Sequence, residues 1–332
     1  MSPERALLER LMQGPATGET LAQAAGQTRA AVWKRVEGLR EAGIAIDATP
    51  GRGYALTHPV DLLDAGLIRA ALGPRVPDRL ASLDVDWSTD STNSALLRAA
   101  ARADDRLEVL LAECQTAGRG RRGRTWASPL AAHLYLSAAR GFGGGLARLG
   151  GLSLVAGVAT VDALHALGCP SVKLKWPNDL VIDGPTGLSK LGGLLVEGAG
   201  EHAGPARAVI GLGLNVHMPE GGADGIDQPW VDLARLMHRP PTRNTLAASV
   251  VSHWVDAFDR FEVDGLVPFL RRYGQIDALA SRTITVHAAR GAFDAVAMGL
   301  GDDGSLQVRM PDGAMQSVHA GEVSVRVASV DA

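Results

Sequence analysis

The stretch 117–126 is incompatible with regular secondary structure. Its sequence, Ala-Gly-Arg-Gly-Arg-Arg-Gly-Arg-Thr-Trp, contains four arginines, three glycines and no acidic residue. Glycine weakens helices and strands, and adjacent guanidinium groups repel one another unless an anion lies among them. Free N–H groups and arginine side chains suit a phosphate chain or a nucleic-acid backbone. The sequence therefore predicts a loop that is mobile when empty and is ordered by a polyanion; the alternative is a solvated basic turn.

The composition limits where such an anion can bind. The chain has 332 residues, of which 46% are hydrophobic and 21% charged, and this balance is typical of a globular protein with two or three domains. The net charge of −3 argues against nonspecific coating of nucleic acid, so a basic site must be local. No apolar stretch approaches the ~20 residues of a membrane span, and the N-terminus lacks a signal-peptide pattern. We therefore expect a cytoplasmic protein without a membrane partner, and free thiols at Cys114 and Cys169.

Residues 1–58 are predicted to form a winged helix-turn-helix domain. Three segments with apolar residues at helical spacing precede an alternating stretch, 44–56, that turns at Pro50-Gly51. The third helix and the hairpin tip place basic and polar residues where groove and phosphate contacts are needed. The predicted DNA-binding residues are Thr28, Arg29, Trp33, Lys34 and Arg52. The alternative is a helical packing domain with no DNA partner.

The rest of the chain predicts two further domains, so the fold class is α/β (α+β) multidomain. Residues 59–80 are predicted to be a linker with a short helix, interrupted by prolines. Residues 81–276 mix strand and helix patterns and predict a domain built on a mixed sheet with helices packed on it. Residues 277–332 are rich in strand patterns and tight turns, and they predict a small antiparallel β-barrel.

Several polar motifs in the central segment suggest a ligand site, although none is specific alone. Asp90-Ser91-Thr92-Asn93 suits a helix cap, Lys175-Trp176-Pro177-Asn178-Asp179 suits a turn after a strand, and Lys190 precedes Gly192-Gly193. The P-loop motif, the serine-hydrolase elbow and the HExxH zinc motif do not occur in the sequence. A P-loop ATPase is therefore not expected.

Taken in order, these motifs resemble the biotin–protein ligase family. The resemblance includes the arginine loop from Gln115 to Trp126, the Lys-Trp-Pro-Asn-Asp motif, the segment Lys190–Glu197 and Gly211-Leu212-Gly213-Leu214-Asn215. It covers the central segment, 81–276, which it implies is the biotin- and ATP-binding catalytic domain. It continues into the C-terminal barrel, 277–332, which it implies is SH3-like. With the N-terminal helix-turn-helix, the chain is similar to the bifunctional form of the family, which is also the biotin operon repressor.

The resemblance implies two reaction steps. Biotin attacks the α-phosphate of ATP to give biotinyl-5′-AMP, and a lysine of a biotin carboxyl carrier protein domain then attacks the adenylate. It implies ATP and Mg²⁺ as cofactors, with Mg²⁺ held mainly by phosphate oxygens rather than by protein ligands. The implied catalytic residues are Lys190, Arg121 and Arg119. The implied biotin-binding residues are Ser91, Thr92, Asn93, Gln115, Arg119, Gly120, Arg121, Lys190, Gly192 and Gly193. The implied nucleotide-binding residues are Arg121, Arg124, Trp126, Lys175, Asn178, Asp179 and Asn215.

The resemblance also implies a homodimer in the adenylate-bound state, which would bind operator DNA of biotin-synthesis genes. Two other functions remain open. A catalytically silent biotin-sensing repressor would not need Lys190 or the complete arginine loop. A lipoate-type ligase shares the catalytic fold but usually carries a different arginine-rich motif and lacks the N-terminal domain. RNA binding by the arginine loop is a more distant alternative, because the loop has no surrounding aromatic platform for stacking bases.

Overall fold

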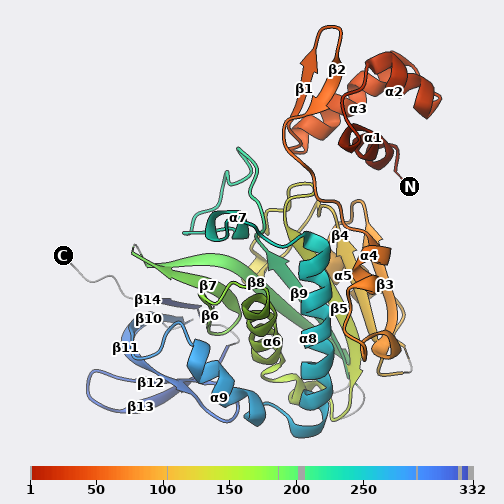
Figure 1. The fold of residues 1–332 in the computed structure, drawn as a ribbon. Helices are drawn as coiled ribbons and strands as arrows, with labels where there is room; N and C mark the ends of the chain where they lie inside the picture. The colour runs from red at the N-terminus through yellow and green to blue at the C-terminus, as the bar shows by residue number, and fades with distance from the viewer. Residues whose placement is uncertain are drawn as a thin grey trace.

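The helix-turn-helix order predicted for the N-terminus is present. The computed structural model describes residues 2–102, 104–185, 187–200, 206–288, 291–320 and 324–327. Each of the first three helices begins after a Ser or Thr whose side chain accepts a hydrogen bond from the first helical turn. A two-stranded antiparallel hairpin follows them and forms the wing (Figure 1). The elements are α1 (Pro3–Met12), α2 (Gly18–Ala25), α3 (Arg29–Glu41), β1 (Ile46–Thr49) and β2 (Gly53–Leu56).

Seven strands form the central sheet, in the order β3-β4-β5-β9-β8-β7-β6. The pair β3 and β4 is parallel, and the other described pairs of this sheet are antiparallel. This arrangement confirms the predicted mixed sheet. The strands are β3 (Leu80–Asp86), β4 (Leu107–Ala112), β5 (Leu134–Phe142), β6 (Val172–Lys175), β7 (Asp179–Gly184), β8 (Gly187–Gly200) and β9 (Ala206–Leu214).

The two faces of this sheet have different roles. Val109 and Leu111 of β4 belong to the large core cluster that includes α6 (Leu152–Ala166) and α8 (Arg243–Asp264), which lie side by side across one face (Figure 1). Leu110 lies between them in sequence and packs on the other face, against α5 (Thr92–Arg98). Because side chains alternate along a strand, the polar residues on the α5 face are kept apart from the core.

The C-terminal strands form an antiparallel sheet in the order β13-β12-β11-β10-β14. Its buried residues join the core cluster of the central domain, and the indole N–H of Trp176 donates to the carbonyl of Gly304 across the boundary at 3.0 Å. The last residues of the predicted C-terminal domain, 328–332, lie outside the described part. The strands are β10 (Thr283–Ala288), β11 (Gly291–Leu300), β12 (Leu306–Arg309), β13 (Met315–Val318) and β14 (Ser324–Val327).

The remaining helices are short and lie between the larger elements. Within the described residues, no helix is both long enough and apolar enough to cross a membrane. The α-helices are α4 (Ala65–Ala70), α7 (Leu233–Leu236) and α9 (Val267–Ile276), and the 3-10 turns are η1 (Pro77–Arg79), η2 (Arg121–Gly123) and η3 (Leu146–Leu149).

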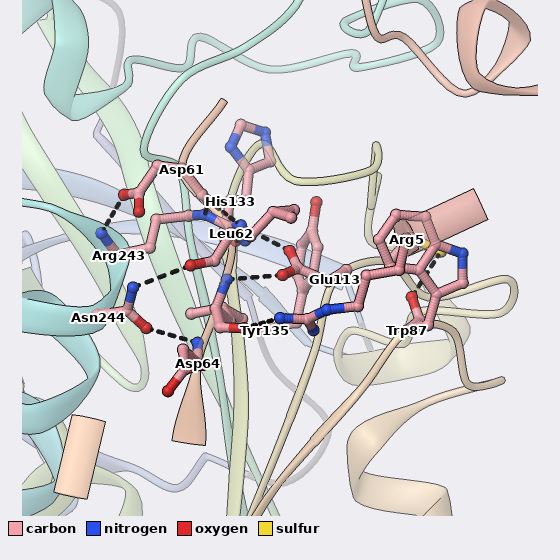
Figure 2. Close-up of polar contacts among 12 residues, drawn as sticks. Arg5, Asp61, Leu62, Asp64, Trp87, Glu113, His133, Tyr135, Arg243 and Asn244 are labelled. Atoms are coloured by element: carbon pink, nitrogen blue, oxygen red, sulfur yellow. Dashed lines mark hydrogen bonds and ion pairs between the residues drawn. The ribbon is translucent and has the colours of Figure 1, made fainter. Parts of the chain in front are cut away.

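A buried ion pair lies beneath the start of the linker (Figure 2). The guanidinium of Arg243, at the N-terminus of α8, donates to the carboxylate of Glu113 at 2.6 Å, and both side chains are almost fully buried. Arg243 also donates to the carbonyl of His133 at 3.1 Å and to that of Asp61 at 2.8 Å. Burial lowers the pKa of His133 to about 4, so its ring is neutral at pH 7 and adds no second positive charge beside Arg243.

The same cluster holds the linker by its backbone (Figure 2). The N–H of Leu63 donates to Glu113 at 2.6 Å, and Asn244 bonds to the carbonyl of Leu62 and to the N–H of Asp64. From the other side, Arg5 of α1 donates to the carbonyl of Leu63 at 3.0 Å. One linker residue is therefore bonded to both domains. The predicted linker is not a loose tether in residues 61–64.

Candidate active site

A cavity of about 820 Å³ opens on the α5 face of the central sheet. Its lining comes from the N-terminus of α5, the arginine loop, the turn between β6 and β7, and the strands β8 and β9. It also includes residues 227–229, whose carbonyl at Pro229 accepts from the N–H of Lys190 at 2.9 Å. Segments from residue 91 to residue 229 of the sequence therefore meet in one site.

One end of the cavity is polar, and the charges next to it, those of Arg119 and Glu197, are paired with each other at 2.7 Å. Gln115 accepts through its side-chain oxygen from the N–H of Thr92 at 2.9 Å, and its amide nitrogen donates to Ser128 at 3.2 Å. Ser137 of β5 is fully buried and donates to the side-chain oxygen of Asn93 at 2.6 Å. These groups are held by one another rather than by solvent, so their positions are set before a ligand arrives.

Two glycines of β9 make room for this end and for the middle of the cavity. A Cβ at Gly211 would lie 2.2 Å from the side-chain oxygen of Asn93, and a Cβ at Gly213 would lie 2.4 Å from the ring of Trp126. Alternate residues of a strand share a face and lie roughly 7 Å apart. The cavity therefore extends along β9 from Asn93 toward Trp126.

The arginine loop forms the other side of the cavity. It is a hydrogen-bonded turn in which the N–H of Gly120 donates to Arg124 at 2.7 Å, and Arg122 has a left-handed backbone with φ of 59°. Arg119 pairs with Glu197 of β8 at 2.7 Å. Arg121 donates to the side-chain oxygen of Asn178 at 3.2 Å and to the carbonyl of Ala320. The loop is thus tied to both the central and the C-terminal sheets.

Lys190 of β8 projects into the cationic end. Its ammonium lies 2.7 Å from a carboxylate oxygen of Asp179 and 5.5 Å from the ring of Trp126. Asp179 follows a cis peptide bond between Trp176 and Pro177, which turns the chain between β6 and β7. Only about 18% of the Lys190 side chain is exposed, so its charge is partly desolvated and acts over short distances.

The structure brings together nearly all the site residues predicted from the sequence. Gly192 and Asn215 are the exceptions. A Cβ at Gly192 would lie 2.8 Å from the carbonyl of Gly213, so this glycine is needed for strand packing. Asn215 donates to the carbonyls of Lys190 and Val231 at 3.4 and 3.1 Å. The predicted residues in the lining are Ser91, Thr92, Asn93, Gln115, Arg119, Gly120, Arg121, Arg124, Trp126, Lys175, Asn178, Asp179, Lys190 and Gly193.

Sequence reasoning missed several residues of the site. Ser137 follows the apolar run Leu134–Leu136 in β5, and Glu197 ends the segment Lys190–Glu197 in β8. A polar residue inside an apolar strand and isolated glycines inside a strand, such as Gly211 and Gly213, are signals that could have identified this face.

The side chains of all five predicted DNA-binding residues are exposed to solvent. Thr28 caps α3, and the other four residues lie on that helix or at the tip of the wing. The indole of Trp33 is 57% exposed, although tryptophan is usually buried. The exposed set is Thr28, Arg29, Trp33, Lys34 and Arg52.

Two family models match parts of this chain. Residues 87–215 match the model of the biotin/lipoate A/B protein ligase family, and residues 4–55 match a helix-turn-helix domain model. A solved structure, the biotin protein ligase from Aquifex aeolicus in complex with biotin and ATP, is similar with a TM-score of 0.62. It is 22% identical and covers 75% of this chain and 100% of that chain, and it establishes the fold.

The sequence relatives cover nearly the whole chain. The bifunctional ligase/repressor BirA of Escherichia coli (strain K12) is 36% identical over 318 residues, which is 94% of this chain and 93% of that protein. The biotin–[acetyl-CoA-carboxylase] ligase of Paracoccus denitrificans is 33% identical over 71% of this chain and 97% of its own length. Since the first of these alignments includes both the helix-turn-helix and the cavity, the chain belongs to the biotin protein ligase family, in its bifunctional ligase/repressor form.

Proposed function

We propose that the protein joins biotin to ATP to form biotinyl-5′-AMP and then transfers biotin to a lysine of a carrier-protein domain. The observation that carries this proposal is one cavity with two chemically different ends. The end around Thr92, Asn93 and Gln115 is polar and neutral, and the end around Lys190 and Arg121 is cationic. A ligand with a neutral polar head and a carboxylate tail fits the first end and reaches the second.

The neutral end would bind the ureido head of biotin. The urea group is polar but uncharged, and its hydrogen bonds must be satisfied once water is excluded. Ser91, Thr92 and Gln115 would bond to it, with Asn93 close by. The glycines of β8 and β9, including Gly193, allow the fused rings and the side chain of biotin to lie close to the strand backbone.

The cationic end would bind ATP and the biotin carboxylate together. In the first step the carboxylate oxygen forms a bond to the α-phosphorus, and the bond to the β-phosphate oxygen breaks to release pyrophosphate. Arg119, Arg121 and Arg124 would offset the repulsion between these anions, and Lys190 would stabilise the charge that develops at the α-phosphate. In the second step the carrier amine attacks the biotin carbonyl, AMP leaves and the amine loses a proton.

The same end suits Mg²⁺ that arrives with ATP. Asn178 and Asp179 place oxygen atoms in the lining, while the described residues contain no group of three or more His, Cys, Asp or Glu arranged to hold a metal. Mg²⁺ usually keeps several waters and takes one or two carboxylates together with substrate phosphates. We therefore propose that the phosphates hold the ion and that Asp179 contributes one oxygen. Lys175 and Trp126 would contact the nucleotide, and Asn215 would support the strand that carries Lys190.

A transfer assay tests the ligase function. The protein is incubated with labelled biotin, ATP and a biotin carboxyl carrier domain, and the carrier is examined for label. Biotin-dependent exchange of pyrophosphate into ATP measures the first step alone. Labelled carrier supports the proposal. Pyrophosphate exchange without labelled carrier would mean that the protein catalyses adenylation but not transfer. Absence of both reactions would instead indicate a silent biotin sensor, and stronger exchange with lipoate than with biotin would indicate a lipoate ligase.

We also propose that the adenylate-bound protein dimerises and represses biotin-synthesis genes. In this proposal residues 1–58 bind DNA, 59–80 form the linker, 81–276 catalyse the reaction and 277–332 form the C-terminal domain. The N-terminal segment is only slightly basic, so one copy neutralises few phosphates and binds DNA weakly. Two copies held in one dimer raise the affinity through effective concentration. Ligand binding would act by shifting the monomer–dimer equilibrium.

Replacing Trp33 and Lys34 with Ala tests the DNA-binding surface. We expect operator affinity to fall roughly tenfold to a hundredfold, because a base-edge contact and a phosphate contact are lost. Adenylation should not change, since both side chains are exposed on α3 and lie outside the cavity. The measurement is an operator-binding titration at fixed salt in the presence of biotin and ATP. Arg75→Ala, an exposed arginine in the linker, is the control; an equal loss in that variant would indicate a general charge effect.

A further inference from the structure

Glu197 lies behind the neutral end of the cavity rather than in its lining. One of its carboxylate oxygens accepts from the side-chain nitrogen of Asn93 at 2.9 Å and from the guanidinium of Arg119 at 2.7 Å. Asn93 in turn accepts from Ser137 at 2.6 Å, and the hydroxyls of Ser137 and Thr92 lie 2.6 Å apart. A single carboxylate therefore begins a chain of hydrogen bonds that ends among the ligand-facing groups.

Glu197 sets the direction of the bonds in that chain together with the carbonyl of Leu195, because both can only accept from the amide nitrogen of Asn93. A carboxylate can only accept, so the amide nitrogen of Asn93 must face it, and the amide oxygen must face Ser137. Ser137 then donates to Asn93, and its own oxygen is left to accept from the hydroxyl of Thr92. The hydrogen of Thr92 is used in this bond. The lone pairs of Thr92 then remain as acceptors for a ligand. The side-chain oxygen of Gln115 already accepts from the N–H of Thr92 at 2.9 Å and lies 3.2 Å from its hydroxyl oxygen, and its second lone pair remains as a further acceptor.

The Asn93 side chain is closely packed. A Cβ at Gly211 would lie 2.2 Å from the amide oxygen, so the side chain lies directly against the backbone of β9. Asn93 is also 96% buried, with a second bond from its nitrogen to the carbonyl of Leu195 at 3.2 Å. If the amide turned over, Ser137 would have to accept and Thr92 would be free to donate. The hydroxyl of Thr92 would then present a donor to the cavity in place of an acceptor.

We propose that Glu197 is a positioning residue that fixes the hydrogen-bond polarity of the neutral end, so that it accepts from the two N–H groups of a cyclic urea. The inference rests on the proposed function, because the ligand it describes is biotin. Glu197 also holds Arg119 at the start of the arginine loop, but that pair is partly exposed and is screened by solvent. The bond to the buried Asn93 is the part that controls recognition.

Substitution of Glu197 measures this role in the biotin-dependent exchange reaction. Glu197→Leu removes the acceptor, and the KM for biotin should rise by about tenfold to a hundredfold while kcat changes by less than about threefold. Glu197→Gln keeps an oxygen that can accept, so it should restore most of the affinity. The KM for ATP should stay near the wild-type value in both variants. Glu108→Gln is the matched control, because Glu108 pairs with Arg207 in the same sheet and does not contact the cavity.

Exchanging the amide of Asn93 and the carboxylate of Glu197 distinguishes an effect of hydrogen-bond direction from an effect of packing. Asn93→Asp puts two carboxylates face to face, and biotin affinity should fall. Adding Glu197→Gln to that variant places an amide donor opposite the new acceptor, and Ser137 can still donate. The double variant should therefore bind biotin more tightly than Asn93→Asp alone. Direct binding by calorimetry, with urea unfolding midpoints of each variant, keeps the comparison valid if one of them is less stable.

The outcomes are distinct. Additive losses in the double variant, or equal rises in KM for ATP and biotin, would overturn the role assigned to Glu197 while the ligase assignment stands. Wild-type protein that shows no biotin-dependent exchange would overturn the proposed function itself. Wild-type activity with unaltered biotin KM in Glu197→Leu would overturn only the positioning role.

Discussion

Lys190→Ala is expected to slow adenylate formation roughly 10²- to 10³-fold, the usual effect of removing one preorganised charge partner from a reaction centre. The side chain is largely buried beside Asp179 and Trp126, so its charge acts in a site with little water. When the carboxylate attacks the α-phosphate, negative charge shifts onto atoms that Lys190 would contact. The measurement is the biotin-dependent pyrophosphate exchange rate at saturating substrate.

Lys173→Ala is the control for this prediction. Lys173 also lies on a strand of the central sheet and pairs with a carboxylate, that of Asp183, at 3.7 Å. Its side chain is about 41% exposed and lies outside the cavity lining, so exchange should proceed at the wild-type rate. An unchanged rate in Lys190→Ala would mean that Lys190 serves only to neutralise Asp179.

Glu113→Ala is expected to destabilise the protein by about 3–5 kcal/mol, because it leaves the charge of Arg243 buried without its partner. At most about 1% of either side chain is exposed. Glu113 also accepts a hydrogen bond from the backbone N–H of Leu63 in the linker. The loss should appear as a lower urea midpoint. The exposed pair Arg260–Asp264 provides the control: Asp264→Ala should change stability by less than about 1 kcal/mol.

A second variant shows whether the effect comes from the charge or from the lost side chain. Glu113→Gln keeps the volume and one acceptor for Leu63 but removes the negative charge. It should therefore lose nearly as much stability as Glu113→Ala if the unpaired guanidinium dominates. A loss below about 1 kcal/mol in Glu113→Gln would show that the linker hydrogen bond and packing matter more than the ion pair.

The sequence predicts the features that are encoded locally. The arginine loop, the cap before α5 and the turn at Asn178-Asp179 are each specified within a few neighbouring residues, and the structure places all three around one cavity. Helix caps follow the same logic, since Ser2, Thr17 and Thr28 each bond within three residues of themselves. The three-part organisation follows from changes in hydrophobic period, which are also local.

Contacts between residues that are far apart in sequence could not be predicted, because no local pattern encodes them. Glu113 and Arg243 are 130 residues apart, and no local pattern indicates that their side chains meet. Glu197 lies 104 residues from Asn93, and its role depends on which strand lies beside which helix. Gly192 and Gly193 are adjacent glycines that the sequence does not distinguish. Only Gly193 lies in the cavity lining, because the strand register determines which face of the sheet each residue occupies.

The bonds on both sides of Leu63 have a consequence for operator architecture. A DNA-reading domain on a free tether would accept half-sites over a range of separations. Here Arg5, Glu113 and Asn244 hold residues 62–64, and the N-terminal core continues through Leu62 into Leu130 of the catalytic domain. In a dimer, the distance between the two α3 helices would then be set by the ligase bodies. We therefore expect the dimer to bind operators with one half-site spacing and to bind much more weakly when that spacing is one base pair longer or shorter.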